Sequence, residues 1–375
     1  LNKPWPLVGG LPFPEGALHD PSQIRIERGN GEEVPSQIDV TATWRDGSIR
    51  WALASFTAGP QGDYHVVYGP SIERRGPAAP LTVEEHENGH LTVNTGVAVY
   101  EFEADRLLPD QARMGPRTFL TNAGAGAYAV DNHGRTARVA GPKAEVTTEI
   151  VKAGPVRTVI RRAGWYVTDG GERLARAEVW FYFYADTPAV KVTHSLVLTR
   201  DTNEVWFHDY GLHFRTAAAP ENVTFALADA EPDNLLAAEP VEADMLVTTR
   251  PGDDEVYMLQ DVYPRFLKRE ARAIAGRVPA NRIATDETTV DSFWIHDWLQ
   301  HTTAVGDWGH GSYNGYGLTV VVPWMAQQFP KEIAFGPDGV RAALWSGRSG
   351  RALDFRTVTL INEHWKNWAT GLHRG

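Results

Sequence analysis

The sequence predicts an all-β fold whose strands are mostly antiparallel and lie in sandwich-type layers. Two strand-forming runs flank the turn Asp169–Gly171, which is the pattern of a β-hairpin. In the second run, bulky side chains alternate between the two faces of the expected strand. We therefore expect this strand to be covered on both sides. One face carries Val179, Phe181 and Phe183, and the other carries Trp180, Tyr182 and Tyr184.

Other segments also indicate strands. Residues 189–199 alternate apolar and polar side chains, and residues 87–105 indicate a pair of strands with a glycine between them. The best candidate for a helix runs from about Pro264 to Gly276, where the glycine is the expected end. Strands therefore dominate, and the fold class is a β-sandwich architecture.

The segment from Gly69 to Pro80 is rich in proline and glycine and shows no strand periodicity, which is typical of a linker. It predicts an N-terminal β-sandwich module at residues 1–69, a linker at residues 70–80 and a large β-sandwich domain at residues 81–375. A chain of 375 residues is long enough for two such domains.

Composition argues against several classes of function. The formal net charge of -11 argues against nucleic-acid binding, because a basic surface supplies most of the affinity for phosphates. The absence of cysteine excludes disulfides, thiolate zinc sites and thiol nucleophiles. No apolar run is long enough for membrane insertion. The sequence also lacks a glycine-rich phosphate loop, and we expect no nucleotide or other cofactor.

A chain without cysteine fits an exported bacterial protein, which avoids thiols that oxidise, and fits a cytosolic protein almost as well. We expect a secreted or periplasmic location. The chain starts at Leu1 and shows no signal peptide, which we interpret as processing or trimming.

Short motifs lie near the two ends of the sequence. "GLPFPEG" spans Gly10–Gly16, "VPSQ" spans Val34–Gln37 and "WRDGSIRW" spans Trp44–Trp51. "PKE" spans Pro330–Glu332, and "LWS" spans Leu344–Ser346. In order and spacing these stretches resemble the exo-rhamnogalacturonan lyase-like family, in which a proline is expected in place of the serine at 346.

The resemblance implies that the larger domain is supersandwich-like, as in polysaccharide lyases and mutarotases. It also implies a substrate that contains uronic acid and cleavage by β-elimination, so that the chain, if it is an enzyme, is a polysaccharide lyase. Members of the family continue into a helical toroid, and this sequence contains no helical array of that size. The chain is therefore expected to be either the β-region of a longer protein or a shortened relative.

Residues His296–Gly317 gather histidines, aromatic rings and five glycines, and we expect them to form a ligand-binding loop. Elimination needs a base, an acid and a cation that neutralises the uronate carboxylate. We assign the base to His310, the acid to Tyr313 and the cation to Arg215. Two further catalytic candidates on the strand expected at residues 206–215 are His208 and His213. The expected substrate-binding residues are Trp308, Tyr316, His296 and His301.

Two interpretations stay open for these residues, ligand binding or catalysis on the one hand and structural packing on the other. The aromatic-rich segment and the strand that carries His208 and His213 are also explained by packing in a sheet. We expect no metal site, because His296, Asp297 and His301 do not have the spacing of a zinc helix motif.

The sequence thus leaves two classes of function. The first is an enzyme that acts on a uronic-acid polysaccharide or oligosaccharide. The second is a non-catalytic β-sandwich protein that binds carbohydrate or assembles into an extracellular structure, and a homo-oligomer fits either class. The sequence does not identify the sugar or the linkage.

Overall fold

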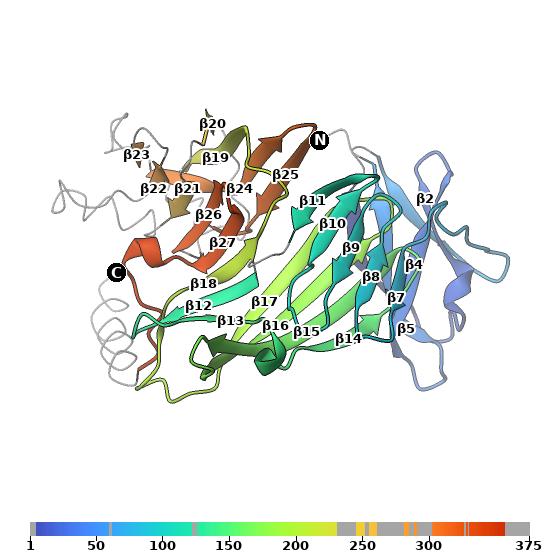
Figure 1. Cartoon of the computed structure of the whole chain (residues 1–375). Coiled ribbons are helices and arrows are strands. Elements are labelled where there is room, and N and C mark those ends of the chain that lie inside the picture. The colour runs from blue at the N-terminus through green and yellow to red at the C-terminus, as the bar shows by residue number, and fades with distance from the viewer. Residues whose placement is uncertain are drawn as a thin grey trace, which may run out of the picture.

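The computed structural model describes residues 5–59, 62–121, 126–230, 245–251, 255–260, 281–284, 289–290, 302–325, 328 and 330–356. These residues form an almost entirely β structure, which confirms the predicted all-β fold class (Figure 1). The helix expected from about Pro264 to Gly276 lies outside the described residues. In the part of the chain that is described, no helix is long and apolar enough to cross a membrane.

The N-terminal module contains two small antiparallel sheets that share one core. Its strands are β1 (Trp5–Pro12), β2 (Ile24–Arg28), β3 (Glu33–Val34), β4 (Ser36–Thr43), β5 (Ile49–Ala58) and β6 (Tyr64–Tyr68). One sheet has the order β1-β5-β4, and the other has the order β3-β2-β6. Ile24, Ile26 and Ile49 are almost completely buried between them.

The turn between β4 and β5 explains why two of the N-terminal motifs occur together. Gly47 has a φ of 83°, a conformation that glycine adopts without steric cost. Oδ1 of Asp46 accepts hydrogen bonds from the amide of Ser48 at 2.9 Å and from its hydroxyl at 2.6 Å. Oγ of Ser48 accepts a further bond from the amide of Gly16 at 2.9 Å. The "GLPFPEG" and "WRDGSIRW" stretches are therefore parts of one local structure.

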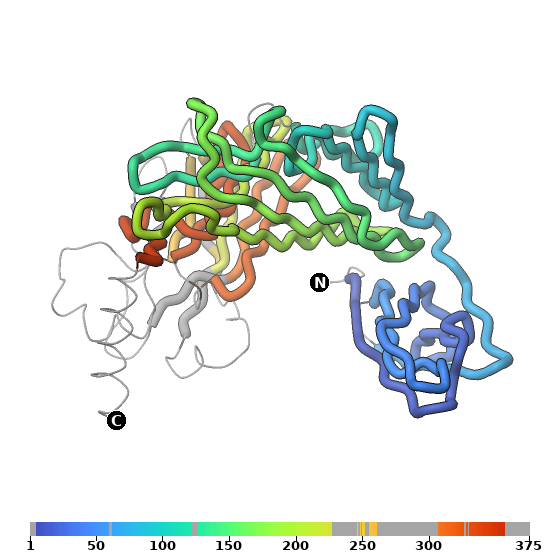
Figure 2. The backbone as a smooth tube through the Cα atoms, turned by 90° about the horizontal axis from the view of Figure 1, so that it is seen from below, coloured from blue at the N-terminus to red at the C-terminus, as the bar shows by residue number. Residues whose placement is uncertain are grey.

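The remaining N-terminal motif, "VPSQ", joins the N-terminal module to the rest of the chain through Gln37. Oε1 of Gln37 accepts hydrogen bonds from the amides of Val156 at 3.2 Å and of Arg157 at 2.9 Å. Figure 2 shows the module, in dark blue, as a separate body beside one end of the larger β structure. Residues 69–81 are all described and contain no strand. The exact domain limits given above stay a prediction.

A 12-stranded antiparallel sheet forms the largest part of the molecule. Its strands follow the order β17-β16-β15-β13-β12-β18-β27-β26-β21-β22-β23, and β14 pairs with β15 beside this path. Their bounds are β12 (Gly126–Asp131), β13 (Thr136–Arg138), β14 (Thr147–Lys152), β15 (Arg157–Thr168), β16 (Arg173–Tyr184), β17 (Val190–Leu198), β18 (Phe207–Phe214), β21 (Val256–Gln260), β22 (Asn281–Ala284), β23 (Thr289–Val290), β26 (Lys331–Gly336) and β27 (Gly339–Trp345).

Two smaller sheets cover one face of this large sheet. The first has the order β11-β10-β9-β8-β7, with β7 (Thr82–Glu85), β8 (Leu91–Asn94), β9 (Val99–Phe102), β10 (Gln111–Met114) and β11 (Arg117–Thr121). The second has the order β20-β19-β24-β25, with β19 (Asn222–Ala230), β20 (Met245–Thr249), β24 (Thr302–Tyr313) and β25 (Tyr316–Val321). We call the covered face of the large sheet the inner face and the opposite one the outer face.

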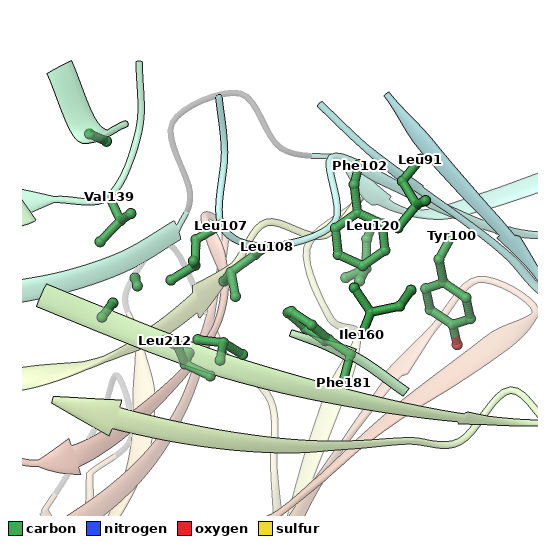
Figure 3. Close-up of a cluster of buried hydrophobic side chains, with 14 of the residues drawn as sticks. Leu91, Tyr100, Phe102, Leu107, Leu108, Leu120, Val139, Ile160, Phe181 and Leu212 are labelled. Carbon is green, nitrogen blue, oxygen red and sulfur yellow. The ribbon is translucent and has the colours of Figure 1, made fainter. Parts of the chain in front are cut away.

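The inner face forms the main hydrophobic core. Phe102 of β9 lies edge-on to Phe181 of β16, with 5.2 Å between the ring centroids (Figure 3). Farther along the sheet, Phe225 of β19 packs against Phe335 of β26. Each fully buried aromatic side chain contributes roughly 2–3 kcal/mol to folding through the removal of its apolar surface from water.

Among the described residues, nothing buries the outer face at β16, where the sequence predicted a cover. Val179, Phe181 and Phe183 lie on the inner face, each with at most 1% of its surface exposed. Trp180 and Tyr182 point to the outer face and are partly exposed. The expectation that this strand is covered on both sides is therefore wrong for these two aromatic residues.

The expectation of a loop at His296–Gly317 is also wrong for its described residues, 302–317. They belong to the hairpin of β24 and β25. A Cβ added at Gly309 would lie 3.0 Å from ring atoms of Phe225 and Phe335, and one at Gly311 would lie 2.9 Å from Phe335. These glycines let the strand approach the buried rings. They serve packing inside a strand, and the expectation that they provide backbone flexibility at a ligand is wrong for these two positions.

The close approach at Gly311 predicts a loss of stability in Gly311→Ala. The added methyl group overpacks the core beside Phe335, and we expect the free energy of unfolding to fall by about 1–3 kcal/mol in urea denaturation. The matched control is Gly9→Ala in β1, where an added Cβ meets nothing within 4 Å. Equal stability of the two variants would show that β24 is not held against the core.

Candidate active site

Charged side chains gather on the outer face where β12, β18, β27 and β26 lie next to one another. Tyr128 pairs with Gly211, Gly211 with Ala343 and Ala343 with Glu332. Paired residues of antiparallel strands point to the same side of a sheet, so this register fixes the common face. We call the group the Arg341 cluster, and it consists of Tyr128, Asp209, His213, Glu255, Glu332, Arg341, Ser346 and Arg348.

Arg341 lies at the centre of the cluster. Its Nη2 is 2.5 Å from Oε1 of Glu332 and 3.0 Å from Oε2 of Glu255, and its Nη1 is 3.8 Å from Oδ2 of Asp209. Burial of the guanidinium opposes its charge, but Glu332 and Glu255 outweigh that effect and raise the pKa of Arg341. Arg341 is therefore a fixed cation that holds three strands together.

Glu332 explains why the two C-terminal motifs occur together. Its side chain is completely buried. Oε2 of Glu332 accepts a hydrogen bond from the Ser346 hydroxyl at 2.6 Å, and Oε1 is 3.1 Å from Nε of Arg348. The amide of Ser346 also donates to the carbonyl of Pro330. The "PKE" and "LWS" stretches thus meet at one buried carboxylate, and the serine at 346 supplies a hydroxyl that a proline lacks.

Asp209 is the group whose protonation changes near neutral pH. Its carboxylate is about one-fifth exposed, accepts a hydrogen bond from the Tyr128 hydroxyl at 3.2 Å and lies against the backbone of Gly347. Burial raises the pKa of Asp209 to about 6. Arg341 lowers it only in part, because that guanidinium is closer to Glu332 and Glu255. A carboxyl group with this pKa is suited to accept and donate a proton.

Two further basic residues lie on the same face, His213 within the cluster and Arg138 at its border. Nε2 of His213 lies 3.0 Å from the carbonyl oxygen of Asp338, so that nitrogen carries the proton and donates it. Burial lowers the pKa of His213, which keeps the ring neutral at neutral pH. Arg138 of β13 pairs with Tyr128 and is exposed. The outer face that carries Asp209 therefore also offers a neutral imidazole and an accessible guanidinium.

The rim of the cluster is formed by η4, a short 3-10 helix at Gly347–Ser349. Arg348 of this helix binds Glu255 and stacks over Tyr257, with 4.2 Å from its Cζ to the ring centroid. A side chain at position 347 would press on the Asp209 carboxylate, since an added Cβ would lie 3.1 Å from Oδ2. Glycine at this position lets the backbone amide approach that carboxylate.

The structure does not bring the predicted base and acid together. His310 and Tyr313 both lie on β24, but they point to opposite faces of that strand. Nδ1 of His310 lies 2.8 Å from the Thr319 hydroxyl on the side away from the core. Tyr313 is buried and stacks on Tyr316 at 4.7 Å with parallel rings. This hairpin covers the inner face of the large sheet, so neither residue lies beside His213 on the outer face.

The remaining predicted site residues are dispersed. Arg215 follows β18, is exposed, and accepts a hydrogen bond on its carbonyl from the amide of Thr121. His208 is partly buried in β18, at an irregularity in its pairing with β12. Trp308 is partly buried in β24 opposite Val321. His296 and His301 lie outside the described residues.

Sequence reasoning missed Asp209, Arg341 and Arg138 as site residues. Asp209 stood in the strand that carried two predicted residues, and alternation placed it on one side with His213. Glu332 lay inside a motif. No local pattern indicated Arg341, because two of its three carboxylate partners, Glu255 and Asp209, are 86 and 132 residues away in the sequence. Among the described residues, no group of three or more His, Cys, Asp or Glu side chains is arranged to hold a metal ion.

Comparison with protein families gives two matches. Residues 6–68 match the model described as the PcRGLX-like N-terminal RIFT barrel domain, and residues 81–225 match the PcRGLX-like protein central beta sandwich domain. Together they cover more than half of the chain. Tyr128, Arg138 and Asp209 lie within the second match, whereas Glu332 and Arg341 lie beyond it. A search of curated proteins gave no significant match.

The raised pKa predicts how Asp209 changes stability with pH. Because its pKa is higher in the folded than in the unfolded chain, Asp209 stabilises the fold when protonated, and this contribution is lost as pH rises through about 6. Asp209→Asn removes the titration. We expect the free energy of unfolding of Asp209→Asn, relative to the unmodified chain, to fall by about 2–3 kcal/mol between pH 8 and pH 4.

Urea denaturation at the two pH values measures this difference. Ser195→Ala is a suitable control, since it alters an exposed group on β17 that does not titrate. A difference between Asp209→Asn and the unmodified chain that stays constant with pH would contradict the raised pKa.

Proposed function

The chain belongs to the PcRGLX-like family, and we propose that it cleaves a uronic-acid-containing polysaccharide by β-elimination at the Arg341 cluster. The family is related to rhamnogalacturonan lyases and is carbohydrate-active. The observation that carries the proposal is the position of Asp209. It is a carboxyl group that titrates near pH 6 on an open sheet face, with an exposed arginine on a nearby strand.

In the proposed reaction, Asp209 transfers the proton in both directions. The Asp209 carboxylate removes the C5 proton of the uronate, and the electron pair of that bond forms the C4–C5 double bond. The C4–oxygen bond breaks, and Asp209 returns the proton to the leaving oxygen. The Tyr128 hydroxyl, which donates to Asp209, orients the carboxylate and stays protonated because burial raises the pKa of Tyr128.

The cation that meets the substrate carboxylate is Arg138. Arg341 is engaged with Glu332 and Glu255 and has only 17% of its side chain exposed. Arg138, in contrast, is exposed and occupies the position next to Tyr128 on the neighbouring strand. A planar guanidinium binds a carboxylate through two parallel hydrogen bonds. This contact stabilises the negative charge that builds up on the uronate during elimination.

His213 has a binding role in this proposal. With Nε2 donating to the carbonyl of Asp338, its Nδ1 is an acceptor that can receive a hydrogen bond from a sugar hydroxyl. His213 lies on β18 four residues from Asp209, which is roughly 13 Å along a strand. That separation places the imidazole at a neighbouring sugar and not at the reacting carbon.

The roles predicted for His310, Tyr313 and Arg215 are not part of this proposal. His310 and Tyr313 point to opposite faces of β24, which disfavours a shared substrate. A non-catalytic carbohydrate-binding protein is the second candidate function. It is favoured by the partly exposed aromatic residues Trp165, Trp180 and Tyr182 on the outer face, which need no proton transfer to bind a sugar.

Turnover of rhamnogalacturonan and polygalacturonate tests the proposal, because the C4–C5 double bond of the product absorbs in the ultraviolet. We expect the rate to rise with pH through about 6, where Asp209 becomes the carboxylate base. Asp209→Asn abolishes the absorbance, and Arg138→Ala lowers kcat/KM by roughly 10²-fold, as for the loss of one preorganised donor.

Two histidine variants complete the design. His86→Ala, in the turn after β7, changes an exposed histidine away from the cluster and is the matched control. His310→Ala separates the two assignments of the active site. Loss of turnover in His310→Ala with full turnover in Asp209→Asn would refute the proposal.

A further inference from the structure

The outer face of β15, β16 and β17 carries a second group of side chains, which has no role in the proposed reaction. In Figure 1 these three long strands lie side by side, and they form one end of the strand order of the large sheet, with β17 at its edge. Clean alternation in β16 sends Arg176, Glu178, Trp180 and Tyr182 to the outer face. We call the whole group the outer platform, and it consists of Trp165, Trp180 and Tyr182 with Arg157, Arg161, Arg173, Arg176 and Lys191.

One basic side chain lies near the ring of Trp180, and two lie near each of the other rings, Arg173 and Arg176 at Trp165 and Lys191 and Arg157 at Tyr182. The Cζ of Arg173 is 5.1 Å from the ring centroid of Trp165, and that of Arg161 is 5.8 Å from the ring centroid of Trp180. Nζ of Lys191 is 5.3 Å from the ring centroid of Tyr182. Such contacts hold the long basic side chains along the rings.

The platform has more positive than negative charge, in a chain whose formal net charge is -11. The carboxylates next to the platform are bound to two of its arginines: Glu149 and Glu178 to Arg161, and Glu145 to Arg173. Within the described residues, no carboxylate lies at ion-pair distance from the other three basic residues. These are Arg157, Arg176 and Lys191.

The platform is shaped to receive an extended molecule. Trp180 and Tyr182 lie about 7 Å apart along β16. Thr193 and Ser195 of β17, which pair with Trp180 and Glu178, are small and exposed and leave the rings accessible from that side. Nε1 of Trp180 donates to Glu178 at 2.7 Å, which fixes the orientation of the indole. Flat rings held in place bind with little loss of side-chain entropy.

The platform and the Arg341 cluster lie on the same face of one sheet. Val167 of β15 pairs with Arg138, and Arg138 pairs with Tyr128. Trp165 is two residues from Val167 on the same strand and therefore points to the same side. The separation between β15 and β12 is two strand spacings, or roughly 10 Å. A chain bound at Arg138 reaches the platform without crossing an edge of the sheet.

We propose that the outer platform binds an anionic polysaccharide, with its aromatic rings against sugar faces and Arg157, Arg176 and Lys191 against uronate carboxylates. The choice of polymer rests on the proposed function, whereas binding itself requires no turnover. The complementary charge favours this occupant over a neutral glycan, and the acidic character of the rest of the chain disfavours nucleic acid.

Affinity electrophoresis of the full chain in gels that contain polygalacturonate or dextran tests the platform. We expect retardation by polygalacturonate alone, and we expect it to be lost at roughly 0.5 M salt, where exposed charges are screened. Trp180→Ala and Arg176→Glu should each weaken binding on the order of tenfold, the size expected for a central contact. The matched controls in the N-terminal module are Trp51→Ala and Arg50→Glu, both at exposed positions, and these should bind as the unmodified chain does.

The outcomes separate this proposal from the proposed function. Asp209→Asn should bind polygalacturonate normally even though it is expected to lose turnover, and an inactive chain that binds through Trp180 would support the platform alone. Equal binding of both polymers, or unchanged binding by Trp180→Ala and Arg176→Glu, would overturn it. A platform variant that changes its oligomeric state in size-exclusion chromatography, while its affinity for polygalacturonate stays unchanged, would also overturn it. The outer face would then be covered by a second copy of the chain.

Discussion

The two-residue period of the large sheet is the constraint on which the rest of the structure depends. A strand turns successive side chains to opposite faces, and pairing transmits that choice from strand to strand. Because two smaller sheets bury the inner face, the charged groups Asp209 of β18 and Arg341 of β27 lie on the outer face. Asp209, Arg341 and Trp180 therefore share one surface, although they come from distant parts of the sequence.

Glu332 shows what it takes to keep a charge in such a sheet. A buried carboxylate is stable only if its oxygens are satisfied, and here Arg341, Arg348 and Ser346 satisfy both. Removing one partner of a buried pair costs about 3–5 kcal/mol, because the other charge is left uncompensated. The same network explains the protonation of Asp209. The guanidinium of Arg341 is engaged elsewhere, so burial decides the pKa of Asp209.

Local patterns predicted much of the fold but little of the site. The hairpin at Asp169–Gly171 and the alternation around Phe181 depend on neighbours in sequence, and both are present in the structure. The glycines at 309 and 311 indicated a loop because the ring of Phe335, which requires them, is a long-range neighbour. The same limit hid Arg341. The motifs were informative for a physical reason: "PKE" and "LWS" are the two sides of one buried contact.

The position of Arg138 connects the proposed chemistry to the proposed binding surface. It pairs with Tyr128 on one side and with Val167 on the other, so it belongs both to the edge of the Arg341 cluster and to the strand path that leads to Trp165. In the proposed reaction, this exposed cation attracts the carboxylate of the sugar that lies nearest to Asp209. In the proposed binding mode, the basic residues of the platform hold the following sugars by the same interaction. In the proposed binding mode a long anionic chain follows the outer face across neighbouring strands, because β12, β13 and β15 are paired in one continuous sheet.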